Sequence, residues 1–372
     1  MKSTTLLALE KFARPLISPL HPRTIISQYS QGRQKFLKAF EQDTPTTNFV
    51  PLDLSQELWG MNFITPLMNA AGMSKNGELY NHFCMQGAGG FLGGTSTWNR
   101  REGNTIKEIY LPFVTYPLSG AASNCLGLPN HGDLINSQRV ASFQKVSDFP
   151  IGWSLMISPD IMPENQLLYL VRGMKLYQRA GVDFLELNES CPNTDHSDEG
   201  LEKRLRYISE NFLRERKRKI PVIIKFSIDT KKENIPYLLD TLFDLNFDGV
   251  NFGNTSKDYN AMRIRIHPRE QKLFDYFTQN IGGGVSGAPL KEKSLEICAC
   301  AVEYRNKANP PQEFHIIRTG GIDTVQDIID SNNVGVSLNQ WFSGYYHNFA
   351  KYGHNVYRNF FSIPLEKGAE PF

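Results

Sequence analysis

The 372-residue chain has little of several features that define whole classes of protein. No uninterrupted apolar run approaches the roughly 18 residues that a membrane span needs. Glu10 and Lys11 interrupt the apolar start of the chain before it could serve as a secretory signal. The five cysteines include no Cys-x-x-Cys pair, which favours reduced thiols inside a cell over a disulfide framework. We therefore expect a cytoplasmic protein, and we predict no metal site.

A strong charge excess and low complexity are also missing. Forty Lys and Arg stand against 38 Asp and Glu, for a net charge of +2, and the 29 Gly and 21 Pro follow no period. Apolar residues make up 40% of the chain and aromatic residues 12%, which is enough for a sizeable buried core. These values exclude a disordered chain, a collagen and a coiled coil.

The first 40 residues differ from the remainder. They contain seven Lys and Arg and one Glu, a local charge of +6, so the other residues sum to −4. Apolar residues recur at helical spacing from Leu6 to Leu20 and from Ile25 to Phe40. We expect Pro15 and Pro19 to break the first run and Pro22 to open a second helix. Two short amphipathic helices of this kind lie on an anionic membrane surface, cap a hydrophobic entrance or pack on the protein's own core.

The rest of the chain shows alternating strand and helix patterns. Eight apolar or β-branched stretches each end in a polar or Gly-rich cluster: 66–71, 90–97, 151–158, 184–189, 221–227, 249–256, 314–321 and 334–343. Helical patterns separate most of them, for example 166–180, 201–218, 234–245 and 290–305. Eight βα units favour an α/β fold, the closed (β/α)8 TIM barrel, with active residues at the C-terminal ends of the strands. A doubly wound open sheet competes, but no Gly-x-Gly-x-x-Gly follows the first strand.

We therefore predict an N-terminal amphipathic helical arm at residues 1–45 and a barrel domain at residues 46–372. A basic cluster, Arg214 and residues 216–219, falls where the fourth barrel helix ends. Cations there complement the helix dipole, so we expect no nucleic-acid partner.

The predicted strand ends are rich in carboxamides and glycines. Asn188 and Asn193 follow the fourth strand, Asn254 follows the sixth, and Asn124 lies in the long segment between the second and third. Converging carboxamides suit a flat heterocycle with carbonyl and N–H groups, although a single Asn is also a common turn residue. Glycine-rich turns at 282–287, 318–321 and 343–344 bring backbone N–H groups close enough to bind a phosphate.

Together these residues resemble the dihydroorotate dehydrogenase family over roughly residues 50–350. The ordered motifs lie at 69–78, 94–97, 101–104, 124–130, 188–194, 221–225, 253–256, 283–290, 319–323 and 342–344. The Asn-Glu-Ser-Cys-Pro-Asn-Thr motif at 188–194 and the Ser-Gly-Ala-Pro-Leu motif at 286–290 are the most specific.

The resemblance implies an FMN enzyme that oxidises dihydroorotate to orotate in pyrimidine synthesis. One substrate hydrogen leaves as a hydride to the flavin, and the other leaves as a proton to a base, which by family position is Cys191. A thiol serves as a base only where its thiolate is stabilised. From its residue type alone Cys191 would be a buried inert thiol, and its Asn-x-x-Cys-Pro-Asn setting favours the base.

The resemblance also assigns binding residues. For the substrate it implies a lysine on the carboxylate and polar groups around the ring: Lys75, Asn124, Gly127, Leu128, Asn188, Asn193, Asn254 and Thr255. For FMN it implies residues around the ring, its electron-rich edge and the phosphate: Ala71, Gly72, Thr95, Ser154, Asn188, Lys225, Gly253, Gly287, Gly320, Gly321, Phe342, Ser343 and Gly344. A lysine in an apolar strand, as Lys225 is, needs a partner or a ligand.

The subclass motifs disagree with one another. The N-terminal arm and Lys75 resemble the membrane-associated, quinone-using members, and Gly94 stands where soluble members have their substrate lysine. Cys191 and the 124–130 segment instead resemble the soluble members, which pass electrons to fumarate or to NAD; quinone-class members generally use a serine base.

Further positions depart from the quinone class. Ser154 stands where that class has a flavin-binding Asn, and Gly253 replaces a hydroxyl residue. Ile26 and Glu108 fall near its quinone-tunnel His and Arg. We expect quinone as the acceptor, with peripheral contact of residues 1–45 to the inner membrane.

Two rival functions stay open. One is a related flavin reductase acting on another dihydropyrimidine, for which Lys75 would have no carboxylate to bind. The other is a phosphate-binding barrel without redox chemistry, which would be colourless when purified. A diverged copy without activity is a third alternative.

Overall fold

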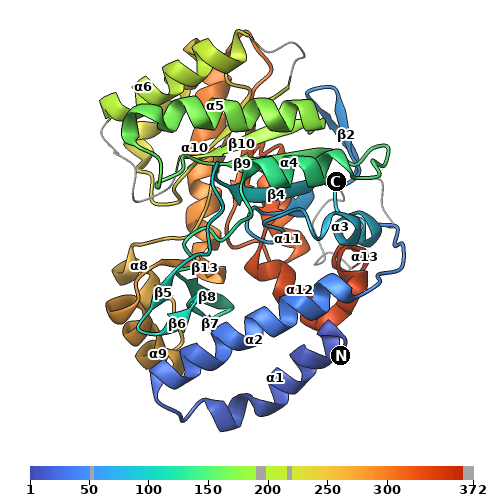
Figure 1. The fold of residues 1–372 in the computed structure, drawn as a ribbon, viewed down its shortest axis with the longest axis vertical. Helices are drawn as coiled ribbons and strands as arrows, with labels where there is room; N and C mark the ends of the chain where they lie inside the picture. The colour runs from blue at the N-terminus through green and yellow to red at the C-terminus, as the bar shows by residue number, and fades with distance from the viewer. Residues whose placement is uncertain (51–53, 190–197, 216–219, 363–372) are drawn as a thin grey trace.

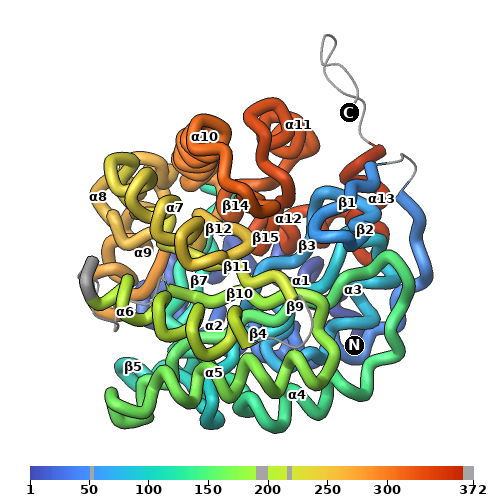
Figure 2. Tube along the Cα trace, turned by 90° about the horizontal axis from the view of Figure 1, so that it is seen from above, coloured from blue at the N-terminus to red at the C-terminus, as the bar shows by residue number. Residues whose placement is uncertain are grey.

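Eight parallel strands form the barrel that the sequence predicts (Figures 1 and 2). The computed structural model describes residues 1–50, 54–189, 198–215 and 220–362. The barrel strands are β3 (Leu67–Asn69), β4 (Phe91–Ser96), β9 (Ile151–Leu155), β10 (Phe184–Asn188), β11 (Val222–Phe226), β12 (Gly249–Phe252), β14 (His315–Thr319) and β15 (Leu338–Trp341). From β4 to β15 each strand is hydrogen-bonded to the next strand of the barrel along the chain, and β15 pairs with β3, so that β3 and β4 are the two ends of the sheet. Every strand falls inside a predicted stretch.

The side chain of Asn69 spans the join between β3 and β4, the two ends of this sheet. Its Nδ2 donates to the Leu92 carbonyl at 2.7 Å, and its Oδ1 accepts from the Leu92 N–H at 3.1 Å. Two backbone bonds supplement it, from the Gly89 N–H to the Leu67 carbonyl at 2.9 Å and from the Gly72 N–H to the Gly94 carbonyl at 2.7 Å. Asn69 is fully buried, so its carboxamide replaces a strand-to-strand ladder where the barrel closes.

Helices surround the barrel. They are α3 (Tyr80–Gln86), α4 (Asp133–Ala141), α5 (Pro163–Ala180), α6 (Asp198–Ile208) with the π-helix η1 (Ser209–Leu213), η2 (Lys232–Asn234), α7 (Ile235–Asp244), α8 (Tyr259–Arg263), α9 (Pro268–Asn280), η3 (Ala288–Leu290), α10 (Lys291–Ala308), α11 (Val325–Asn333), α12 (Ser343–Tyr352), η4 (Gly353–Asn355) and α13 (Val356–Phe361). Local signals set several boundaries: α5 begins with Pro163 and ends at Gly181 in the left-handed conformation. Thr324 and Asp327 form a capping box at α11. The predicted fourth barrel helix corresponds to α6 and η1, and residues 216–219 of the basic cluster lie outside the described part.

Smaller sheets close the two ends of the barrel. At its N-terminal end the hairpin of β1 (Gln56–Leu58) and β2 (Met61–Phe63) contributes Leu58 and Phe63 to an apolar plug inside the strands. At its C-terminal end β7 (Phe113–Tyr116), β8 (Ala121–Asn124) and β13 (Gly284–Gly287) form an antiparallel sheet. The short hairpin β5 (Thr105–Ile106) and β6 (Ile109–Tyr110) lies beside it.

The N-terminal residues form two helices, α1 (Ser3–Ile17) and α2 (Pro22–Gln42), which run side by side (Figure 1). Pro22 opens α2, as predicted. The prediction that Pro15 breaks the first run was wrong, because α1 continues to Ile17 and ends before Pro19. A proline near the end of a helix removes one N–H bond, and the helix had only a few residues left to lose.

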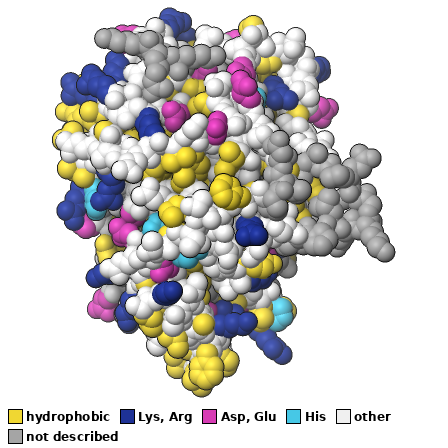
Figure 3. All heavy atoms as spheres, turned by 90° about the vertical axis from the view of Figure 1, so that its right-hand side faces the viewer, with side chains coloured by type: hydrophobic (Ala, Val, Ile, Leu, Met, Phe, Trp, Pro, Cys, Tyr) yellow, Lys and Arg dark blue, Asp and Glu magenta, His cyan; other side chains and the backbone are white. Residues whose placement is uncertain are grey.

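The two helices have different surroundings. Helix α2 buries Ile26, Phe36 and Phe40, of which Phe36 and Phe40 pack against aromatic side chains of α12, and the helix also contacts β6, β7 and α9. In α1, Ser3 is the buried residue, while Phe12 and Leu16 are 81% and 74% exposed. Figure 3 shows apolar side chains at the lower end of the molecule, where Figure 1 places α1. Among the described residues, no helix is long and apolar enough to cross a bilayer.

Candidate active site

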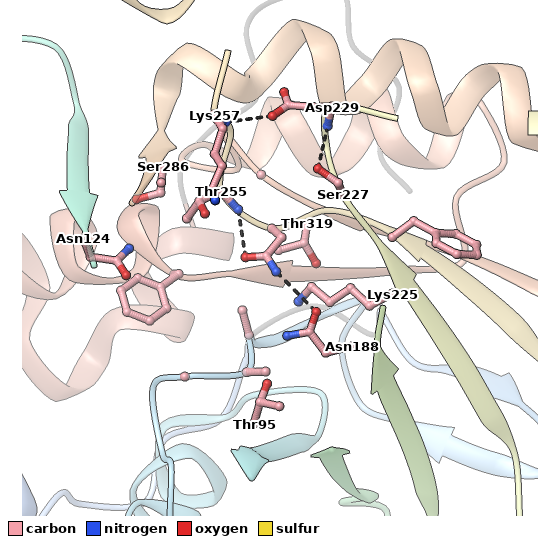
Figure 4. Close-up of a pocket in the computed structure, with 18 of the residues that line it drawn as sticks. Thr95, Asn124, Asn188, Lys225, Ser227, Asp229, Thr255, Lys257, Ser286 and Thr319 are labelled. Atoms are coloured by element: carbon pink, nitrogen blue, oxygen red, sulfur yellow. Dashed lines mark hydrogen bonds between the residues drawn. The ribbon is translucent and has the colours of Figure 1, made fainter. Parts of the chain in front are cut away.

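A cavity of about 1010 Å³ opens at the C-terminal ends of the barrel strands, where the strand-end residues were expected to meet (Figure 4). Its volume is at the upper end of the range for small-molecule sites. It brings together most of the predicted residues: Ala71, Gly72, Lys75, Thr95, Asn124, Gly127, Leu128, Asn188, Lys225, Asn254, Thr255, Gly287, Gly320, Gly321, Phe342, Ser343 and Gly344.

One end of the cavity is suited to a phosphate. The Ser286 and Ser343 hydroxyl groups lie 2.9 Å apart, from the end of β13 and the first turn of α12. Gly320 and Gly321 follow β14 and line the same space. Hydroxyl donors at the N-terminus of a ten-residue helix form a typical anion-binding arrangement.

Close packing requires two glycines of this end. A Cβ on Gly344 would lie 1.9 Å from the Ile322 carbonyl oxygen, and one on Gly321 would lie 2.3 Å from the Lys291 backbone N. Gly321 also has a φ of +73°, which L side chains rarely adopt. These two glycines therefore let the loops after β14 and β15 approach the neighbouring backbone.

A flat wall continues from the phosphate end. Gly72 lies where a Cβ would project toward the Phe342 ring at 3.6 Å, and Thr95 faces the same space. Two residues predicted to bind the cofactor lie behind this wall. Ser154 is fully buried and its hydroxyl is 2.9 Å from that of Thr95, so it supports Thr95 from behind. A Cβ on Gly253 would lie 2.4 Å from the Thr319 Cβ, so packing inside the barrel requires that glycine.

Lys225 lies in the floor of the cavity and has the partner that its apolar strand required. Its Nζ is 3.4 Å from Glu186 Oε1 on β10, and the two side chains are 5% and 0% exposed. The sequence interpretation missed Glu186, although a charged residue between two leucines of a barrel strand was a usable signal. Asn251, Thr319 and Gln340 complete a polar layer around this pair.

Carboxamides gather on the other side of the cavity. Asn254 Nδ2 donates to Asn188 Oδ1 at 3.5 Å, and Asn254 Oδ1 accepts from the Thr255 N–H at 2.9 Å. Asn124, at the end of β8, faces the cavity from the antiparallel sheet (Figure 4). Strands from both sheets thus supply amide donors and acceptors to one space, as expected for a flat polar heterocycle.

Lys75 lines the same cavity and is half-buried. Burial, together with the nearby Arg33 cation, lowers the pKa of the Lys75 ammonium to about 7, while Glu78 acts in the opposite direction. Within the described part of the chain, the Lys75 ammonium has no hydrogen-bond or ion-pair partner. An anionic ligand group would supply the missing partner.

Two further polar side chains, Arg33 and Tyr346, lie near Lys75 on the side of the N-terminal helices. Arg33, on α2, lies over the Phe113 ring at 5.6 Å, and Tyr346, on α12, packs against Phe36 and Phe342 at 5.8 and 5.5 Å between ring centroids. Burial raises the pKa of the Tyr346 phenol to about 12. For the described residues, neither the Arg33 guanidinium nor the Tyr346 hydroxyl has a hydrogen-bond partner. The sequence interpretation missed both residues, because the proximity of Arg33 on α2 and Tyr346 on α12 to Lys75 is a tertiary feature.

The two positions near the quinone-tunnel His and Arg of the quinone class have separate surroundings. Ile26 is a fully buried residue of α2. Glu108 is exposed and forms a 2.5 Å ion pair with Arg23 of α2, whose guanidinium also donates to the Lys107 carbonyl at 3.2 Å. Here the cation comes from the arm and the anion from the loop between β5 and β6.

Two predicted residues, the base Cys191 and the substrate residue Asn193, lie outside the described residues. Their assignments therefore stay predictions.

Fold and site together are those of a barrel enzyme with one cavity at the C-terminal strand ends, lined by a buried lysine, carboxamides and glycine-rich turns. A family model for dihydroorotate dehydrogenase matches residues 53–362. The dihydroorotate dehydrogenase (quinone) of Klebsiella pneumoniae is 30% identical over 296 residues, which cover 77% of this chain and 81% of that protein. The protein of the same name from Buchnera aphidicola is 26% identical over 362 residues, 92% of this chain and 96% of that protein.

A solved structure shows the same fold. The ligand-free dihydroorotate dehydrogenase of Eimeria tenella superposes with a TM-score of 0.71 at 20% identity, over 87% of this chain and 91% of that one. The chain therefore belongs to the dihydroorotate dehydrogenase family. As a member it is an oxidoreductase, and the family implies a flavin cofactor.

Proposed function

We propose that the protein is an FMN-dependent enzyme of pyrimidine biosynthesis that oxidises dihydroorotate to orotate and passes the electrons to a quinone. One observation supports this proposal most: a single cavity combines an end suited to a phosphate, a buried lysine, a carboxamide cluster and Lys75, which has no hydrogen-bond or ion-pair partner among the described residues. The names of the related proteins, dihydroorotate dehydrogenase (quinone), agree with it.

The residues present fit FMN. The hydroxyls of Ser286 and Ser343 and the backbone of Gly320 and Gly321 would hold its phosphate. Gly72 would leave room for the ring, and the Lys225 ammonium would lie beside the ring edge that gains negative charge. Bound FMN supplies the hydride acceptor of the reaction.

The substrate end performs binding and proton transfer. The Lys75 ammonium would pair with the substrate carboxylate, and Asn124, Asn188 and Asn254 would hydrogen-bond the ring amides and carbonyls. Cys191 would accept the proton that leaves from the carbon next to the hydride donor. Rigid carboxamides on strand ends orient the ring, so that one face meets the hydride acceptor and the other meets the base.

We propose that the acceptor approaches from the arm. Arg33 of α2 and Tyr346 of α12 lie beside the cavity residues Lys75 and Phe342, and within the described residues their donors have no hydrogen-bond partner, which suits a carbonyl oxygen. The exposed apolar residues of α1 and the basic arm suit the surface of an anionic membrane, where a lipid-soluble quinone resides. In this proposal the protein is cytoplasmic and peripheral on the inner membrane.

An anaerobic titration tests the reaction. We expect the purified protein to be yellow and its flavin band to bleach on addition of dihydroorotate, with reoxidation by a short-chain quinone faster than by fumarate or NAD. A yellow protein that bleaches with dihydrouracil instead would move the substrate to another dihydropyrimidine. A colourless protein that cannot be reconstituted with FMN would refute the flavoenzyme proposal.

Faster reoxidation by fumarate or NAD would assign the protein to the soluble type that Cys191 and residues 124–130 resemble. The acceptor comparison therefore decides between the two subclasses without affecting the assignment of the substrate.

A further inference from the structure

A polar layer crosses the barrel interior directly beneath the cavity. Lys225 Nζ is 3.4 Å from both Glu186 Oε1 and Gln340 Oε1. The other carboxylate oxygen, Glu186 Oε2, accepts from Asn251 Nδ2 at 2.9 Å and from Gln340 Nε2 at 2.8 Å. The Thr319 hydroxyl lies 3.0 Å from both Asn251 Oδ1 and Gln340 Oε1. Five different strands thus contribute one residue each.

The hydrogen bonds of the layer favour one charge state. Three donors, from Lys225, Asn251 and Gln340, converge on the Glu186 carboxylate, and every one of these side chains is buried. An ionised carboxylate only accepts hydrogen bonds, so this arrangement suits a charged Glu186 opposite a charged Lys225.

Glu186 has no place on the cavity wall. Lys225, Thr319 and Gln340 line the cavity, whereas Glu186 and Asn251 lie below them. Glu186 therefore reaches any group in the cavity through Lys225. This arrangement separates Lys225, which would contact the flavin, from the residue that supports it.

An ammonium group in an apolar barrel is costly to keep charged without a counter-ion. Removing Glu186 would leave Lys225 with the Gln340 amide oxygen as its partner among the described residues, and the lysine would lose its proton or leave its position. A neutral or displaced lysine no longer stabilises negative charge on a reduced flavin.

We propose that Glu186 is a positioning residue that keeps Lys225 charged and in place, and that it thereby raises the reduction potential of the bound flavin. The inference rests on the proposed function, because it requires FMN beside Lys225. A purely structural Glu186 would affect folding without a specific effect on the flavin, and a Glu186 that acts directly as a negative charge would lower the potential.

The test is the midpoint potential of the bound flavin in Glu186→Gln, measured by equilibration with a reference dye. We expect reduced flavin to lose at least tenfold in relative stability, which for a two-electron couple is a shift of about 30 mV to lower potential. In the Lys225→Met background, Glu186→Gln should change the relative stability of reduced flavin by less than about threefold.

Asn251→Leu is the matched control, because it removes an uncharged member of the same layer and leaves the ion pair intact. We expect Asn251→Leu to change the relative stability of reduced flavin by less than about threefold. A rise of the potential in Glu186→Gln, no shift, an equal shift in Asn251→Leu, or an undiminished shift in the Lys225→Met background would each overturn the proposal.

If Glu186→Gln does not retain FMN, Glu186→Asp decides. It keeps the charge but shortens the side chain, so we expect a smaller shift in the same direction, and a rise or no shift would overturn the proposal. A parent protein that binds no FMN would instead refute the proposed function, so the two failures are distinguishable.

Discussion

Lys75 and Lys225 show how different partners give one residue type two roles. Lys225 is neutralised within the barrel by Glu186 on the neighbouring strand. Among the described residues Lys75 has no such partner, and burial beside Arg33 lowers its pKa to about 7. A lysine with a nearby carboxylate supports a cofactor site, whereas an unpaired lysine is available for an anionic ligand.

The pKa of Lys75 leads to a pH prediction for orotate binding. Free Lys75 loses its proton as the pH rises through about 7, and the orotate carboxylate binds the ammonium form. We therefore expect the orotate Kd to be constant below pH 7 and to rise by up to tenfold per pH unit above it. Titrations of the flavin spectrum from about pH 6 to 8.5 measure this effect.

Lys75→Arg is the control, because an arginine stays charged over the whole range and should give a flat Kd. Lys75→Met should weaken orotate binding by about 10- to 150-fold, the value of a hydrogen bond to a charged group. A flat profile in the parent protein, or unchanged binding in Lys75→Met, would contradict a carboxylate at Lys75.

The base can be tested although Cys191 lies outside the described residues. We expect Cys191→Ala to retain FMN and orotate binding, and to slow flavin reduction by dihydroorotate about 10²- to 10⁴-fold, the usual contribution of a general base. Stopped-flow measurement of flavin bleaching checks this. Cys300→Ala on α10 should bleach at the parental rate, and an equally fast Cys191→Ala would exclude the thiol as the base.

At the level of secondary structure, the two arm helices differ in what they bury. Helix α2 contributes Ile26, Phe36 and Phe40 to the core, so its removal would expose apolar surface. Helix α1 packs Leu6, Leu7 and Ile17 against the core and accepts a hydrogen bond at Glu10 from the Tyr29 hydroxyl of α2 at 2.7 Å. Arg14, also on α1, binds the same carboxylate. Burial raises the pKa of Tyr29 to about 12, so its phenol remains a donor. An experiment on membrane contact should therefore change α1 alone.

We expect the triple variant Leu9→Gln, Phe12→Gln and Leu16→Gln to lose binding to vesicles with anionic lipid by at least about a hundredfold. Each exposed apolar side chain that inserts contributes about 1.5 kcal/mol or more. Reduction of a membrane-embedded quinone should fall with vesicle binding, while flavin bleaching by dihydroorotate stays at the parental rate. Co-sedimentation and the two half-reactions measure these effects.

A matched triple change on the barrel surface, Leu134→Gln, Met162→Gln and Ile264→Gln, removes equally exposed apolar residues away from the arm. It should bind vesicles as the parent does. Equal vesicle binding by the α1 variant would show that the arm does not contact the membrane.

For the whole molecule, a buried carboxamide contributes to closure of the barrel. Between β3 and β4 the Asn69 side chain pairs with both backbone groups of Leu92. The same closure places the residues after β3, Ala71 and Gly72, next to Thr95 in the cavity. Stability and cofactor binding therefore share this join.

We expect Asn69→Ala to lower the free energy of unfolding by about 2–5 kcal/mol, because it leaves a buried N–H and a buried carbonyl of Leu92 unpaired. It should also weaken FMN retention. Urea unfolding followed by tryptophan fluorescence measures the loss. Asn62→Ala on the exposed part of β2 should change stability by less than about 0.5 kcal/mol, and an equal effect of both changes would argue against this role for Asn69.

The sequence by itself determined the barrel and most of the cavity wall. Apolar runs that end in glycines or carboxamides, such as those before Asn188 and Asn254, predict strands and the positions where they end. These ends meet because parallel barrel strands have their C-terminal ends on one side of the barrel. Strand-end position is a local property, so Asn188 and Asn254 could be predicted to meet, whereas Lys75 and Thr95 were expected there because of the family resemblance. The path of α1 through Pro15 could not be predicted, because the free-energy cost of a proline in a helix depends on how many helical residues follow it.

Only the tertiary structure decided which residues stand behind that wall. Ser154 and Gly253 follow the same pattern as the lining residues, yet they support Thr95 and pack on Thr319. Glu186, Arg33 and Tyr346 are distant from the motifs in sequence or buried among apolar neighbours. Their roles depend on distances across the barrel and between α2 and α12, since a charge acts on whatever lies within a few ångströms of it and not on its neighbours along the chain.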